Sequence, residues 1–168
     1  MKARSSRSAS RSRKTRVPLS SLRTSEVVRA IVDHPRRLDE LVSMIEESDL
    51  RVRDRAAATL ARLAESHPGR LLRVLDRLAE GLTDDSAYVR WNLAFAFGAV
   101  GARFPRRLPD FLARLSDRLD DENRVVRVIA CRSLMRVAAR QPKVLLDHFE
   151  STKRQAPRPL QRLLRSDR

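Results

Sequence analysis

Apolar side chains recur every three or four residues along most of the chain, and this pattern itself repeats with a period of 37 residues. The dipeptide Val-Arg marks the period, because it occurs at 52–53, 89–90 and 126–127. Other columns of the repeat are apolar in all three copies: Leu38, Leu75 and Leu112; Leu41, Leu78 and Leu115; Leu60, Phe97 and Leu134; Leu63, Val100 and Val137. A period of this length is typical of solenoids, in which each unit buries its apolar face against its neighbours.

Each unit contains two amphipathic stretches, so the pattern predicts two helices per repeat. Acidic and turn-forming residues such as Asp84-Asp85-Ser86 separate them and suit a helix N-cap. A proline closes each unit at Pro68, Pro105 and Pro142, where a new helix can begin. The predicted helices cover 24–33, 36–47, 51–65, 69–81, 87–102, 106–119, 124–139, 142–152 and 159–165. Glycine is rare and no alternating pattern indicates strands.

These columns resemble the HEAT-repeat family, which groups with the armadillo-type and phycobilin-lyase-like α-solenoid repeats. The resemblance covers about residues 36–150 and implies an all-α fold: a right-handed superhelix of about three to four helix pairs whose second helices line the concave surface. It also implies a ladder of ion pairs between an acidic column and an arginine column, so that these arginines are structural. The two columns are Glu47, Asp84 and Asp121, and Arg53, Arg90 and Arg127.

Charge divides the chain into three parts. The whole chain has 36 basic and 21 acidic residues and a net charge of +15. Residues 1–16 contain seven basic residues and no acidic one, and the last eighteen residues are also strongly basic. We therefore expect a basic Arg/Ser-rich disordered tail at 1–20, a HEAT-repeat solenoid at 21–152 and a basic C-terminal segment at 153–168. Ala156-Pro157-Arg158-Pro159 suggests a linker.

The basic tail suits sequence-independent binding to the phosphates of DNA or RNA. Its candidate contacts are Lys2, Arg4, Arg7, Arg11, Arg13, Lys14 and Arg16. A solubilising tail fits the same composition, and an organelle transit peptide fits it less well because an apolar face is missing.

The second helices supply a candidate groove. Trp91, Asn92 and Phe95 lie within about one helical turn, with Arg62, Arg132 and Arg136 in neighbouring repeats. Such a groove could stack a base or hold a phosphate backbone. The alternative is that the two aromatic side chains pack between repeats.

No known catalytic or metal-binding motif accompanies these residues, so we expect a non-enzymatic module without cofactor or metal. The predicted function is binding of a nucleic acid or nucleoprotein; the alternative is a scaffold that binds an acidic peptide or helix. A remote alternative is a HEAT-like DNA alkylation-repair glycosylase that uses Trp91 with Asp54 or Asp85. Cys131 lies in a core column, which favours a buried structural thiol. We expect no membrane partner, no small-molecule substrate, and a cytoplasmic location with nucleoid or ribosome association as options.

Overall fold

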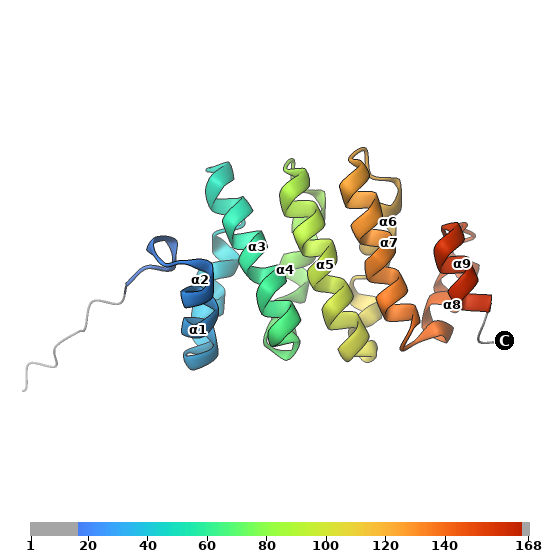
Figure 1. Cartoon of the computed structure of the whole chain (residues 1–168), viewed down its shortest axis with the longest axis horizontal. Helices are drawn as coiled ribbons and strands as arrows, with labels where there is room; N and C mark the ends of the chain where they lie inside the picture. The colour runs from blue at the N-terminus through green and yellow to red at the C-terminus, as the bar shows by residue number, and fades with distance from the viewer. Residues whose placement is uncertain (1–16, 166–168) are drawn as a thin grey trace, which may run out of the picture.

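The structure, a computed structural model, describes residues 17–165 except for the side chain of Asp110. Every regular element in this range is helical, and the helices form a short solenoid. Figure 1 shows α3, α5 and α7 side by side in one row, with α2, α4 and α6 in a second layer behind them. The all-α prediction is therefore confirmed for this part of the chain.

The second helix of each repeat is long and begins at a side-chain cap. These helices are α3 (Leu50–Ser66), α5 (Ala87–Arg103) and α7 (Arg124–Ala138). Asp49, Ser86 and Asn123 occupy one column of the repeat, and each accepts a hydrogen bond from a backbone N–H of the first turn. Capping of these otherwise unpaired N–H groups stabilises a helix start. The predicted ranges 51–65, 87–102 and 124–139 agree with the structure.

The first helix of each repeat is broken, contrary to the continuous helices predicted at 36–47, 69–81 and 106–119. Its α-helical part has only six residues: α2 (Leu38–Ser43), α4 (Leu75–Glu80) and α6 (Leu112–Asp117). Turns of 3-10 helix flank it at Pro35–Arg37, Pro68–Leu71, Gly81–Thr83, Pro105–Asp110 and Arg118–Asp120. Val74 and Phe111 stand at two of the breaks with non-helical backbone angles, and both side chains are buried. Core packing thus overrides helical continuity there.

The core runs between the two layers and contains the predicted apolar columns. Phe97 of α5 packs against Phe111, with the ring centroids 4.5 Å apart. Leu78, Leu60 and Val100 are fully enclosed. Gly98 marks a close approach of α5 to α7, because a Cβ at this position would lie 2.8 Å from the Cα of Ser133.

Shorter helices close the two ends. At the start, η1 (Leu19–Ser21) and α1 (Thr24–Asp33) precede the first repeat, and Leu19 is fully buried. At the other end, α8 (Pro142–Ser151) leads into α9 (Arg158–Arg165), which packs on α7 and α8. Leu160 and Leu164 of α9 are buried, as is Ala156 in the segment expected to be a linker. Packed structure therefore extends beyond residues 21–152 in both directions.

Candidate functional site

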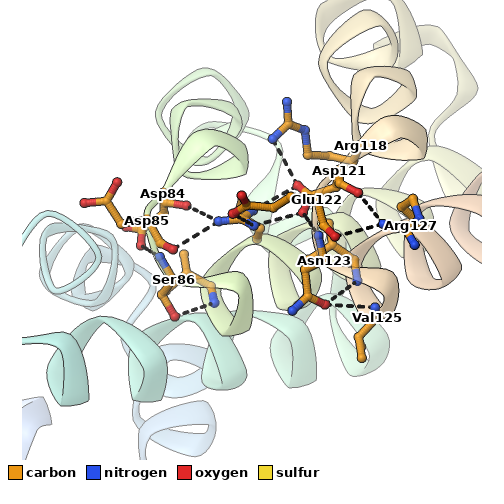
Figure 2. Close-up of polar contacts among 12 residues, drawn as sticks. Asp84, Asp85, Ser86, Arg118, Asp121, Glu122, Asn123, Val125 and Arg127 are labelled. Carbon is orange, nitrogen blue, oxygen red and sulfur yellow. Dashed lines mark hydrogen bonds and ion pairs between the residues drawn. The ribbon is translucent and has the colours of Figure 1, made fainter.

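The arginine and acidic columns meet along the edge of the solenoid where the second helices begin. Arg90 donates from Nε and Nη2 to the two carboxylate oxygens of Asp121, at 2.9 Å each. Its Nη1 donates to the carbonyls of Asp84 and Asp85 in its own repeat. Figure 2 shows the turn at Asp84, Asp85 and Ser86 beside the turn at Asp121, Glu122 and Asn123. One arginine therefore ties its own turn to the turn of the next repeat.

Burial strengthens the ion pair between Arg90 and Asp121. The side chains of Arg90 and Asp121 are only 6% and 2% exposed. Burial by itself raises the pKa of Asp121, but hydrogen bonds from Arg90 and from the Asn123 N–H outweigh it and hold the pKa below its usual value. The hydrogen bond to Asp121 raises the pKa of Arg90. Both groups are thus charged at neutral pH.

The other two arginines of the column vary the same arrangement. Arg53 bonds to the carbonyls of its own turn, and its Nε lies 3.1 Å from Asp84 Oδ2 in an ion pair that lacks hydrogen-bond alignment. Arg127 also holds its own turn, at 2.6 Å from the carbonyl of Asp121. The position 31 residues after Arg127 is Arg158, so no acidic residue continues the ladder. These contacts explain the arginine column as part of the fold.

A different set of side chains lies on the exposed face of α3, α5 and α7, here called the second-helix face. Tyr88, Val125 and Val128 are among the most exposed large apolar residues in the described range. Trp91 and Phe95 are half-buried on α5. The rings of Tyr88 and Trp91 meet edge to face, with their centroids 5.0 Å apart. These five residues form what we call the apolar strip. Exposed apolar side chains that gather in one place are typical of interaction sites.

Three arginines lie on the same face as the apolar strip. Arg62 on α3 and Arg132 on α7 are exposed, and within residues 17–165 neither makes an ion pair. Arg136 is also exposed, but it donates two hydrogen bonds to Glu65 of α3, at 2.8 and 3.3 Å. Its guanidinium carbon lies 6.0 Å from the centroid of the Phe95 ring, within the range of a cation–π contact.

The bridge between Glu65 and Arg136 connects the first and third of the long helices. Packed helices lie about 8–10 Å apart, so α3 and α7 would be separated by about 20 Å in a flat layer. The two side chains nevertheless meet across α5, from the first repeat to the third. The bridge therefore crosses α5, as expected if the second helices line the concave surface that the HEAT resemblance implies.

Charge is divided between the two layers. The helices α3, α5 and α7 contain ten arginines and two acidic residues. The first helices with their turns, residues 35–49, 67–86 and 104–123, contain nine arginines and fourteen acidic residues. The concave layer thus has a net charge of +8, whereas the outer layer has −5. A field of this kind attracts acidic partners to the concave side.

The structure brings most of the predicted groove residues together, but not all of them. Trp91, Phe95, Arg62, Arg132 and Arg136 share the second-helix face. Asn92 does not, since it is 3% exposed and donates to the Tyr88 carbonyl of its own helix. The predicted nucleic-acid contacts Lys2, Arg4, Arg7, Arg11, Arg13, Lys14 and Arg16 lie outside the described residues. Tyr88, Val125 and Glu65 were not predicted to belong to the groove. The signal for Tyr88 is its position one helical turn before Trp91.

Asp54 and Cys131, which were considered for a chemical role, are part of the helix packing. Asp54 accepts a hydrogen bond of 2.7 Å from the Ser86 hydroxyl, which links α3 to the cap of α5. Cys131 is half-buried rather than buried as expected, because the eight-residue α9 covers less of α7 than a full second helix would. Burial raises the pKa of its thiol, which disfavours the reactive thiolate. Across residues 17–165, no three His, Cys, Asp or Glu side chains converge in a way that would hold a metal ion.

Comparison with known proteins identifies the repeat. The model of the HEAT-like repeat matches residues 50–100, which run from α3 through most of α5. No curated protein matches the chain. None of the helices in the described part is both long and apolar enough to cross a membrane. The family match shows a HEAT-like repeat at residues 50–100, and the recurring helix pairs are consistent with a solenoid of such repeats.

Proposed function

We propose that this protein is a binding module whose concave second-helix face takes up an acidic, apolar-anchored segment of a partner protein. HEAT-like repeats generally serve as interaction scaffolds without catalytic activity of their own, so the binding chemistry depends on the exposed side chains. The observation that carries the proposal is the apolar strip within an arginine-rich face.

The strip favours a protein partner for two reasons. Val125 and Val128 are more than two-fifths exposed and offer apolar contact, which suits a side chain of Leu, Ile or Phe rather than a phosphate. Arg62 and Arg132 have exposed guanidinium groups that can pair with carboxylates at the rim. Apolar anchors surrounded by complementary charges are the usual anatomy of a protein interface.

Trp91 provides a direct measurement, because it is the only tryptophan in the chain and lies within the strip. The probe is a synthetic amphipathic peptide of about 16 residues, with Leu at helical spacing and Glu at the other positions. Binding in the groove should shift Trp91 emission to shorter wavelength as the ring loses contact with water. A peptide with Gln in place of Glu should bind more weakly.

Two matched variants test the location. Val125→Asp places a charge in the strip, whereas Val17→Asp makes the same change at the N-terminal end, and the two valines are both 53% exposed. We expect Val125→Asp to abolish the fluorescence change and Val17→Asp to leave it intact. Equal binding by both variants, or a preference for the Gln peptide, would contradict the proposal.

Nucleic-acid binding through the basic ends is the second candidate. It rests on the seven basic residues of 1–16 and on α9, whose Arg158, Arg162 and Arg165 lie on its exposed side. Hydrogen bonds from Arg37 to the Val17 carbonyl and from the Leu19 N–H to Glu40 hold the point where residues 1–16 join the solenoid. This function predicts steeply salt-dependent binding of DNA or RNA that is lost when residues 1–16 are deleted, with little change in Trp91 emission.

A further inference from the structure

The bridge between Glu65 and Arg136 has the form of an internal substitute for a bound partner. Its two side chains come from helices separated by a whole repeat, and they join above the ring of Phe95. The middle repeat carries alanine at both corresponding positions, Ala99 and Ala102, which leaves room for the bridge to cross. A carboxylate is therefore already seated against the arginine that faces the apolar strip.

The remaining charged groups of the face give Glu65 a special position. Only two acidic residues belong to α3, α5 and α7. Asp54 is engaged by the Ser86 hydroxyl, whereas the carboxylate of Glu65 accepts its hydrogen bonds from Arg136. Glu65 is 53% exposed and Arg136 is 42% exposed. Ion pairs with such exposure are weak and exchange readily with solvent or another anion.

We infer that Glu65 occupies Arg136 as a built-in competitor, and that a carboxylate of the acidic partner displaces it on binding. This inference rests on the function proposed above and adds a regulatory contact to the same face. The bridge closes the half of the face near the ends of the helices, while Tyr88, Trp91, Val125 and Val128 leave the other half open. The partner's apolar anchors enter the open half, and its carboxylate then opens the bridge.

The geometry also sets the spacing of the partner's side chains. Trp91 and Ala99 are eight residues apart on α5, and at 1.5 Å per residue this corresponds to about 12 Å. The displacing carboxylate should therefore lie about 12 Å from the apolar anchor, which is about two turns of a helical partner. In a peptide that keeps a single Glu at this spacing and has Gln elsewhere, moving the Glu by one turn should weaken binding.

The test compares two single substitutions of nearly identical character. Glu65→Gln removes the competing charge and keeps the shape of the side chain. Glu46→Gln makes the same charge change in the outer layer, where Glu46 pairs with Arg77 at 2.6 Å and exposed fractions of 55% and 41% closely match those of the Glu65 pair. The probe is the Leu/Glu peptide, and the readout is its Kd from Trp91 emission.

We expect Glu65→Gln to tighten peptide binding about two- to fivefold, the range expected for release of an exposed ion pair. Glu46→Gln should leave the Kd unchanged. In the Arg136→Gln background, Glu65→Gln should have no further effect, because the arginine for which it competes is absent. Equal gains from Glu65→Gln and Glu46→Gln would show a general charge effect and overturn the inference, as would weaker binding by Glu65→Gln.

A second measurement separates failure of this inference from failure of the proposed function. The melting temperatures of Glu65→Gln, Arg136→Gln and the double variant report whether the two side chains interact in the free protein. If the shifts in melting temperature are additive and peptide binding is intact, then Glu65 does not compete for Arg136, and the proposed binding function is unaffected. Interacting side chains with no peptide binding by any variant would overturn both the function and the competition that depends on it.

Discussion

Arginines serve two different purposes at two places on the same three helices. Along the edge where the helices begin, Arg53, Arg90 and Arg127 bond to backbone carbonyls, and two of them also pair with an aspartate of the next repeat. On the concave face, Arg62 and Arg132 are exposed and Arg136 reaches a distant glutamate. The arginines that recur in all three repeats stabilise the turns before the second helices, whereas Arg62, Arg132 and Arg136 are the ones that we propose contact a ligand.

The largest loss of stability that this comparison predicts is at the buried Arg90–Asp121 pair. Arg90→Ala should lower the free energy of unfolding by about 3–5 kcal/mol, because it leaves the buried carboxylate of Asp121 without its main partner. Urea denaturation measures the loss. Arg127→Ala removes an arginine of the same column that has no acidic partner in the next repeat, and should cost less than about 2 kcal/mol. Equal losses would show that the inter-repeat pair adds nothing to the ladder.

Unfolding at acidic pH should reveal the contribution of the Arg90–Asp121 pair in a different way. The pKa of Asp121 is lowered in the folded protein, so the carboxylate contributes stability above its unfolded pKa, and this contribution is lost as the pH falls through the lower folded value. Asp121→Asn lacks the contribution at every pH. The difference in unfolding free energy between the original protein and Asp121→Asn should therefore be largest near pH 7 and should shrink below about pH 4.

Asp85→Asn is the control for this titration. Asp85 neighbours Asp84 in the equivalent turn, but its side chain is exposed and its contact with Arg90 is through its backbone carbonyl. Its difference from the original protein near pH 7 should be much smaller than that of Asp121→Asn. A difference for Asp121→Asn that grows on acidification would mean that the carboxylate is not stabilised in its charged form.

The ladder was predictable from the sequence because its members recur at fixed intervals. The second helices were predictable for the same reason, since Asp49, Ser86 and Asn123 cap them at one column. The breaks in the first helices were not, because they depend on how Val74 and Phe111 enter the core.

The concave face was only partly predictable, since it depends on how far the layer curves and how each helix is rotated. Periodicity identified Trp91 and Phe95, but it also suggested Asn92, which the rotation of α5 turns inward. Glu65 and Arg136 are 71 residues apart and lie in different columns. Their contact depends on how three helices pack together, which no local sequence pattern encodes.

The smallest change in stability, and the clearest separation of the two groups of arginines, is expected for Arg132→Ala. This residue is exposed on α7, and its side chain makes no hydrogen bond or ion pair among the described residues, so its loss should alter the free energy of unfolding by less than about 0.5 kcal/mol. Binding of the Leu/Glu peptide should nevertheless weaken about two- to fivefold, because one rim arginine can no longer pair with a carboxylate. Arg114→Ala removes the same charge from an exposed position on α6 in the outer layer and should change neither quantity. If Arg132→Ala destabilised the fold as Arg90→Ala does, or if Arg114→Ala weakened the peptide equally, then position relative to the repeat would not distinguish structural from ligand-binding arginines.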